Sequence, residues 1–259
     1  TADRARLIKA LEARNPALLA AFREARRETE GASQLLRESG RFPLCGRGDV
    51  NTYTVFAELD RSLIAARGRS GIIVPSGIAT DDTTKHFFSD LVETGSLVSL
   101  FDFRNHDALF YDVGHRRFKF CLMTVAGSAG RVGAAEFAFF VEDPAELTSA
   151  ESRYPLTRDD LRLLNPNTRT CPTFRTRRDA EITKAIYRRV PVLIDEAKGQ
   201  DGNPWGVSFQ AMFHMANDSG LFRTRQQLEA DGWTLDGNVF TRAADRYFPL
   251  YEAKMIHHF

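Results

Sequence analysis

The chain has 259 residues, 43% of them apolar and 27% charged, and a formal net charge of +1. No apolar run is long enough to cross a bilayer and no signal peptide opens the chain, which favours a globular cytoplasmic protein with residues enough for two domains. The near-neutral charge gives no overall indication of nucleic-acid binding. Cys45, Cys121 and Cys171 form no CxxC pair, so buried thiols are predicted rather than a disulfide framework or a zinc site.

The first part of the chain is predicted to be helical over 3–39, because apolar residues recur there at three- and four-residue spacing among Arg and Glu. Asn15 is expected to cap a second helix within this region. After turn-rich residues 40–49, Asn51 or Thr52 is expected to cap another helix. The apolar face of that helix would contain Tyr53, Phe56, Leu59, Leu63 and Ile64.

An α/β unit is predicted to follow. Residues 71–74 form a short β-branched run between Gly and Pro, which is typical of a buried central strand in a parallel sheet. A helix is expected to begin near Thr80, with Phe87, Phe88 and Leu91 on one face. Strands are predicted at 97–103, 117–125 and 136–141. Their succession indicates a parallel core followed by antiparallel strands.

The glycine-rich segment GSAGRVG at 127–133 is predicted to be a hairpin connection. A phosphate-binding loop would need a strand before it and a helix after it, and a strand pattern follows here. The α/β rhythm stops near a linker-like patch at 143–155, which places a domain boundary at about residue 150. Helices are then expected at 179–189 and 208–217. Asp236-Gly237 predicts a hairpin turn.

Motifs of several enzyme classes are absent from the sequence, which contains no HExxH, GxSxG or GxxxxGK[ST] pattern. A magnesium-dependent restriction nuclease would need a carboxylate followed at a distance by ExK. Asp245 with Glu252-Ala253-Lys254 fits this pattern, and so does Glu196-Ala197-Lys198 with an earlier acid. A nuclease therefore remains an alternative.

Four segments carry a family resemblance through their order and spacing. They are GRGDVNTYTVFAELDRSL (46–63), RSGIIVPSGIATDDTTKHFFSDL (69–91), LVSLFDFRNHDALFYDV (97–113) and HRRFKFCLMTVAG (115–127). In this order they resemble adenine-N6 DNA methyltransferases of the gamma class, most closely those of large restriction-modification and phage-defence systems. Residues 164–191 and 248–259 are similar to segments downstream of the catalytic core in that family.

The resemblance implies a Rossmann-like domain that binds S-adenosylmethionine at a glycine-containing loop and grips a flipped adenine with a [DNS]PP[YFW] motif. Neither element stands in this chain, and Asn165-Pro166-Asn167 lacks the second proline and the aromatic residue. The chain is therefore expected to begin after the catalytic motif and to be inactive by itself. Residues 1–150 would be the C-terminal half of the methyltransferase domain, with 1–45 as a helical insertion. Residues 151–259 would form a linker and the start of a mixed α+β target-recognition region.

The same resemblance implies site residues. Phe110 falls at the position that stacks on the extruded base, with Tyr111 as its nearest competitor, although a core phenylalanine is the alternative. Asn51, Tyr53 and Phe56 fall near the cofactor, although an apolar helix face explains them equally well. Pro75 would shape the carboxyl edge of the sheet.

The segment 158–189 is strongly basic, with nine Arg and Lys against four Asp and Glu. Its arginines are expected to contact the phosphates of double-stranded DNA, because the guanidinium fork matches phosphate geometry. The candidates are Arg169, Arg175, Arg177 and Arg178. A solvated face, or ion pairs with nearby acids of the same segment, is the alternative. A non-catalytic DNA-binding or specificity subunit, working with other restriction or defence subunits, is also left open.

Overall fold

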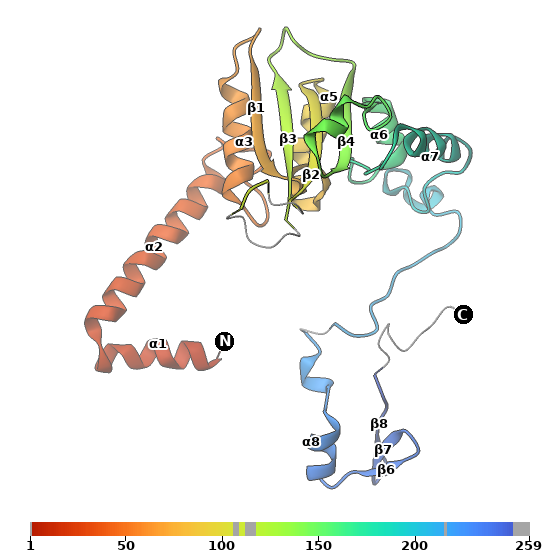
Figure 1. The fold of residues 1–259 in the computed structure, drawn as a ribbon. Helices are drawn as coiled ribbons and strands as arrows, with labels where there is room; N and C mark the ends of the chain where they lie inside the picture. The colour runs from red at the N-terminus through yellow and green to blue at the C-terminus, as the bar shows by residue number, and fades with distance from the viewer. Residues whose placement is uncertain (1, 106–108, 112–117, 215–216, 251–259) are drawn as a thin grey trace. The chain divides into compact units, whose positions relative to one another are not determined.

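The computed structural model describes residues 2–105, 109–111, 118–214 and 217–250 (Figure 1). The chain divides into two compact units, Thr1–Gly206 and Val207–Phe259. The first unit is built around a five-stranded mixed sheet of order β1-β3-β2-β4-β5. Its strands are β1 (Arg69–Pro75), β2 (Leu97–Arg104), β3 (Lys119–Ala126), β4 (Ala134–Val141) and β5 (Tyr154–Thr157).

The strand directions place three carboxyl ends at one edge of this sheet. β1 and β2 are both antiparallel to β3, β2 is parallel to β4, and β5 is antiparallel to β4. β1, β2 and β4 therefore end at the same edge, which we call the carboxyl edge. The prediction that residues 71–74 form a central strand of a parallel sheet is wrong, because among the described residues β1 lies at the sheet margin and its one partner is antiparallel β3.

The hairpin predicted for residues 127–133 is also wrong. These residues connect β3 to β4, and β2 lies between the two strands in the sheet. The alternation of apolar residues identified each strand but carries no information on which strands are neighbours. The connection therefore crosses over an intervening strand instead of turning back on itself.

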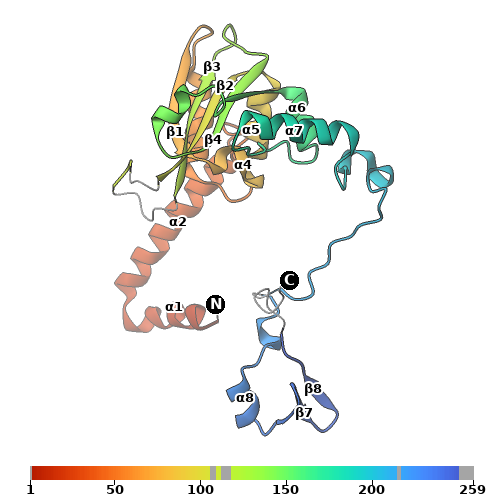
Figure 2. The same ribbon diagram turned by 45° about the vertical axis from the view of Figure 1, so that its right-hand side comes forward.

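The helices of the first unit are α1 (Ala2–Arg14), α2 (Pro16–Glu38), α3 (Thr52–Leu63), α4 (Gly77–Thr80), α5 (Lys85–Glu93), α6 (Arg158–Leu164) and α7 (Arg177–Arg189), with 3-10 turns at η1 (Asp82–Thr84), η3 (Pro144–Thr148) and η4 (Glu196–Gly202). The predicted cap of α2 is confirmed, since Asn15 Oδ1 accepts a hydrogen bond from Leu18 N at 3.0 Å. α6 and α7 pack side by side (Figure 2).

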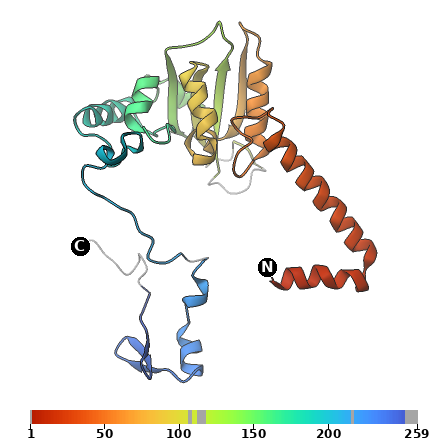
Figure 3. The same cartoon turned by 180° about the vertical axis from the view of Figure 1, so that it is seen from behind.

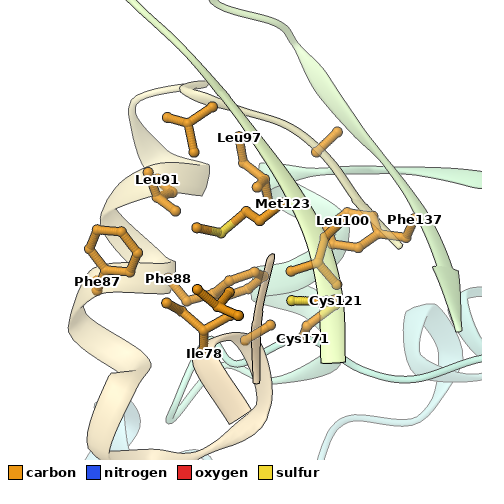
Figure 4. Close-up of a cluster of buried hydrophobic side chains, with 14 of the residues drawn as sticks. Ile78, Phe87, Phe88, Leu91, Leu97, Leu100, Cys121, Met123, Phe137 and Cys171 are labelled. Atoms are coloured by element: carbon orange, nitrogen blue, oxygen red, sulfur yellow. The ribbon is translucent and has the colours of Figure 1, made fainter. Parts of the chain in front are cut away.

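The main core lies between the sheet and the helices α3, α4 and α5, which lie on one face of the strands (Figure 3). We call this the helical face. Phe87, Phe88 and Leu91 of α5 are fully buried there, as predicted, against side chains such as Leu100 and Met123 (Figure 4). The opposite face carries a small cluster of Phe103, Ala138 and Val141 with Phe120 packed against it. The three free cysteines are buried, as predicted.

The face that α3 buries differs from the predicted one. Thr54, Val55, Ala57 and Glu58 are buried. Phe56 and Leu63 are 68% and 75% exposed. The side of α3 that carries Glu58 faces inward, because the Glu58 carboxylate accepts hydrogen bonds from the backbone N–H groups of Leu44 and Cys45, at 3.1 and 2.8 Å. The apolar spacing alone could not reveal these polar anchors.

The first unit continues past the domain boundary predicted at about residue 150. β5 pairs with β4, and Tyr154 in β5 is 1% exposed in the main core. The Tyr154 hydroxyl donates to Phe174 O at 3.1 Å and ties the following coil to the sheet. The division between compact units falls instead after Gly206.

The second unit contains the 3-10 turn η5 (Ser219–Leu221), α8 (Arg225–Ala230) and a sheet of β6 (Thr234–Asp236), β7 (Val239–Arg242) and β8 (Asp245–Tyr247). The predicted hairpin is confirmed, but its two turn residues are Gly237 and Asn238, because Asp236 pairs with Val239. Gly237 has φ +60°, which favours glycine. The helix predicted at 208–217 is wrong for its described residues 208–214, which are irregular.

Candidate functional site at the carboxyl edge

A cavity of about 440 Å³ opens where β1 ends, and residues from six segments of the chain line it. We call it the carboxyl-edge cavity. Ligands of open α/β sheets bind at this edge, because loops from several strands meet there. The lining residues include Asn51, Tyr53, Ser76, Asp81, Asp102 and Lys119.

Asp102 is the buried anchor of this edge. It is 1% exposed and lies near the end of β2, in the mostly apolar run LVSLFDF. Ser76, directly after β1, donates its hydroxyl to Asp102 Oδ1. Phe140 N in β4 donates to Asp102 Oδ2 at 3.1 Å. One carboxylate therefore joins the ends of β1, β2 and β4.

A β-bulge in β4 stands opposite Asp102. Phe101 pairs with Ala138 and Phe103 with Val141, so β4 carries one residue more than β2 over this stretch. Phe140 has φ +63°, an uncommon value for a bulky residue. The extra residue lets both Phe139 and Phe140 pack on the helical face, while Val141 packs on the opposite face. Bulges re-aim side chains in this way and are frequent next to active sites.

Three cations surround the ring of Phe140. Arg104 Cζ lies 4.9 Å from the ring centroid, Lys119 Nζ 5.1 Å and Arg175 Cζ 5.6 Å. We call this arrangement the Phe140 cluster. It brings Arg175, one of the predicted DNA-contacting residues, next to the carboxyl-edge cavity, which Lys119 also lines.

Two of the three residues predicted near the cofactor line the cavity. Asn51 caps α3, with its Oδ1 accepting from Tyr53 N at 3.4 Å. Tyr53 is half-buried, and burial, followed by the charge of Asp81, raises the pKa of its phenol. Phe56 is exposed and is not among the lining residues. The structure thus brings together Asn51 and Tyr53 and turns Phe56 away.

The backbone of Phe110 is held by the buried side chain of Asn105. Asn105 is 2% exposed; its Nδ2 donates to Phe110 O and its Oδ1 accepts from Phe110 N, both at 3.0 Å. The Phe110 ring, 41% exposed, packs edge-on against Phe120 with centroids 5.0 Å apart. Phe120 belongs to the opposite face, so Phe110 does not line the cavity. Tyr111 is 88% exposed.

Much of the basic segment is engaged in ion pairs. Arg162 binds both oxygens of Glu93, at 2.9 and 2.6 Å. Arg169 reaches the same carboxylate at 3.1 Å and Arg158 at 3.9 Å. We call this the Glu93 cluster. Arg169, a predicted DNA contact, is thus paired, whereas Arg177 and Arg178 at the start of α7 are exposed.

The loop at Asn165-Pro166-Asn167 acts as a structural connector. Asn167 Nδ2 donates to Ile194 O at 2.8 Å, and Asn167 Oδ1 accepts from Glu196 N at 2.9 Å. Asn165 Nδ2 donates to Thr170 O at 2.9 Å. The asparagine side chains are therefore used in hydrogen bonds inside the fold.

The residues of the nuclease alternative are placed in part. Lys198 forms an ion pair with Asp195 at 2.9 Å, and Glu196 lies beside it in η4. Asp245 begins β8 opposite Arg242, while Glu252 and Lys254 lie outside the described residues. Among the residues that the structure describes, no group of three His, Cys, Asp or Glu side chains is arranged to hold a metal ion.

Six site residues were missed from the sequence: Ser76, Asp81, Asp102, Arg104, Lys119 and Phe140. A usable signal exists for Asp102, because an acid inside an apolar strand must find partners when it is buried. No comparable signal exists for Arg104 and Lys119, which meet only through the pairing of β2 with β3.

Comparison of the sequence with protein-family models finds no match, and comparison with curated proteins finds none either. Within the described residues, no helix has both the length and the apolar character needed to cross a membrane.

Proposed function

We propose that this chain forms the pocket-supporting part of a DNA methyltransferase that transfers a methyl group from S-adenosylmethionine to adenine N6. The enzyme would act in the cytoplasm within a restriction-modification or phage-defence system. The observation that carries the proposal is the carboxyl-edge cavity, where Asn51 and Tyr53, the residues that the family resemblance puts near the cofactor, lie beside Asp81. Its volume of about 440 Å³ suits a small ligand.

The donor set of the cavity fits the cofactor. The half-buried ring of Tyr53 offers an aromatic surface, and the exposed Asp81 carboxylate is an acceptor for hydroxyl or ammonium groups. When bound, S-adenosylmethionine would supply the methyl group. This chain's own residues would bind and orient it, while Asp102 holds the surrounding strand ends in place.

Phe110 supports the second half of the proposal. Adenine N6 is inaccessible inside a duplex, so the base must be extruded and held by stacking and hydrogen bonds. An exposed aromatic ring whose backbone is fixed at both N and O by Asn105 is preorganised for such stacking. Its fixed position favours it over Tyr111, which is almost fully exposed.

The sheet also has room for the strands that the proposal requires. β1 pairs with β3 along one edge, so its other edge can accept a further strand. A Rossmann-like sheet with its catalytic half on that side would use this edge. Because the sequence holds neither the glycine loop nor the adenine-gripping motif, we expect the chain alone to transfer no methyl groups.

The proposal is tested by methyl transfer from tritiated S-adenosylmethionine to unmethylated genomic DNA, catalysed by the whole protein that contains this chain. We expect N6-methyladenine as the product, identified by mass spectrometry of the digested DNA. Phe110→Ala should lower kcat/KM by about tenfold, since stacking contributes about 1 to 3 kcal/mol per base. Phe110→Tyr should retain most of the activity, and Leu63→Ala, at an exposed position of α3, should retain all of it.

The Phe140 cluster also favours a second candidate, a DNA-binding or specificity subunit without catalysis, because such cations can grip DNA in either case. The same assay separates the two. DNA binding by the whole protein without any N6-methyladenine formation would overturn the methyltransferase proposal and leave the subunit.

A further inference from the structure

We propose that Arg104, Lys119 and Arg175 form a phosphate-binding site that holds the backbone of a DNA strand beside the carboxyl-edge cavity. The inference deepens the proposed function and rests on it for the identity of the ligand as DNA. The three cations come from separate segments of the chain and meet at one place. Arg104 ends β2, Lys119 begins β3 and Arg175 stands in the coil before α7, yet all three lie within 5.6 Å of one ring centroid.

The charge of the cluster is incompletely balanced. Arg104 pairs with Glu142 at 3.5 Å. In the part of the chain that the structure describes, neither Lys119 nor Arg175 has an acidic partner within ion-pair distance. Asp102 lies nearby, but its two oxygens accept hydrogen bonds from Ser76 and Phe140. These donors are neutral and leave the Asp102 charge in place, so the three cations exceed Glu142 and Asp102 by one positive charge. The donor groups of Lys119 and Arg175 are therefore available to an anion.

The fold holds the ring between these cations at an energetic cost. Phe140 adopts φ +63°, a conformation that is strained for a bulky non-glycine residue. The bulge that produces it is fixed by the hydrogen bond to Asp102. Each cation gains attraction from the ring, but three cations around one ring also repel one another. An oxyanion bound among them would relieve that repulsion.

A DNA phosphate matches the site better than the carboxylate of a small cofactor. Lys119 and Arg175 are exposed, so their charges reach solvent where a long backbone can pass. Two guanidinium forks and one ammonium supply donors in several directions, as the oxygens of a phosphate require. Lys119 also lines the carboxyl-edge cavity, so a phosphate held here would place its own nucleotide at the cavity mouth.

The test compares DNA binding by the chain and by two double variants that each lose two positive charges. In the first, Lys119 and Arg175 are both replaced by Gln. In the matched control, Arg67→Gln and Arg69→Gln remove two exposed arginines at the amino end of β1, which is the opposite edge of the sheet. Fluorescence anisotropy with a labelled duplex is recorded over a range of salt concentrations, and circular dichroism confirms that each variant is folded.

We expect the Lys119/Arg175 variant to bind about tenfold more weakly at low salt. The slope of log affinity against log salt should fall by about 1, the value for one lost phosphate contact. The control should change affinity less than twofold. Equal losses in both variants, an unchanged slope in the cluster variant, or no DNA binding by the unmodified chain would each overturn the proposal. Should the cluster variant fail to fold, Lys119→Gln alone gives the same reading, with a proportionately smaller effect.

A second arm separates the phosphate from the cofactor carboxylate. Calorimetric titration of the whole protein with S-adenosylmethionine should give the same Kd for the unmodified protein and the cluster variant. Weaker cofactor binding with unchanged DNA binding would assign the cluster to the carboxylate and overturn the proposal. Neither measurement depends on methyl transfer, so failure of this site and failure of the proposed enzymatic activity are distinguishable.

Discussion

Phe140 donates its backbone N–H to the carboxylate of Asp102 at 3.1 Å, and this hydrogen bond lies at the bulge near the carboxyl end of β4. Because the same carboxylate also accepts the Ser76 hydroxyl, a single buried acid determines the geometry of the strand ends. Asp102→Asn would turn an amide N–H₂ toward one of these two donors. We expect it to lower the free energy of unfolding by about 2 to 3 kcal/mol, since a buried donor would lose its acceptor.

Urea denaturation measures this change, and Ser76→Ala is the matched control. The serine variant keeps the Phe140 bond but leaves the buried Asp102 Oδ1 without its donor, so it should be destabilised by about 1 to 3 kcal/mol while the bulge itself is retained. An Asp102→Asn protein as stable as the unmodified chain would show that the carboxylate does not hold the bulge.

Asn105 is expected to control the order of the backbone at Phe110. Asn105→Ala removes both hydrogen bonds to that residue, one to its N–H and one to its carbonyl. The amide hydrogen of Phe110 should then exchange with solvent at least about tenfold faster, because local opening no longer has to break them. Hydrogen exchange read by mass spectrometry detects this. The amides of the α5 core, such as that of Leu91, serve as internal reference, and unchanged exchange at Phe110 would contradict the role of Asn105.

Glu93 is expected to stabilise the first unit in a salt-dependent manner. Glu93→Gln leaves Arg158, Arg162 and Arg169 close together without their shared carboxylate, which is 26% exposed. Pairs with such exposure contribute modestly, so a loss of about 1 kcal/mol is expected at low salt. Thermal unfolding at low and at high salt tests this, because salt screens the exposed charges. A difference from the unmodified chain that stays constant with salt would argue against an electrostatic origin.

The buried cysteines are expected to resist alkylation. Burial, with the charge of Glu58, raises the pKa of Cys45 to about 12, and burial, with the charge of Asp102, raises that of Cys121 to about 12. Burial also raises the pKa of Cys171. At pH 8.5 the thiolate fraction of Cys45 and Cys121 should be lower than in the unfolded chain by about a thousandfold, because each pKa unit is a factor of ten. Iodoacetamide labelling with and without denaturant measures this difference by mass.

The sign of the accompanying pH dependence follows from these raised values. The unfolded chain releases thiol protons near the ordinary pKa of 9.0, while the folded chain holds those of Cys45 and Cys121 up to about 12. The stability due to protonated thiols is therefore complete below pH 9 and declines as the pH rises from there toward 12. Stability that increases over this range would contradict the burial of the thiols.

The spacing of apolar residues predicted where several helices and strands lie along the chain, but it did not predict which strands are neighbours in the sheet. α5 was readable because Phe87, Phe88 and Leu91 repeat with helical spacing and all three are buried. α3 was placed correctly along the chain but rotated, since Glu58 is drawn inward by backbone N–H groups from residues 44–45. The order β1-β3-β2-β4-β5 depends on contacts between distant segments, which no local pattern contains.

The candidate site was predictable to a similar extent. Asn51 and Tyr53 were named through resemblance, and they lie together in the cavity. Arg175 was named through local charge, but its neighbours Arg104 and Lys119 were not, because they are distant in sequence and carry no special spacing. Charge density within the basic segment did not distinguish Arg169, which is paired with Glu93, from Arg175.

The bulge in β4 could be lost in evolution without disturbing the hydrophobic core. Deletion of the single codon for Phe140 would restore regular alternation, with Phe139 still on the helical face and Val141 still on the opposite face. The hydrophobic core would keep its pattern, while the platform for the three cations would disappear. At this one position, insertion or deletion of a single residue can add or remove the aromatic ring that the cations contact, while the other residues of β4 keep their faces.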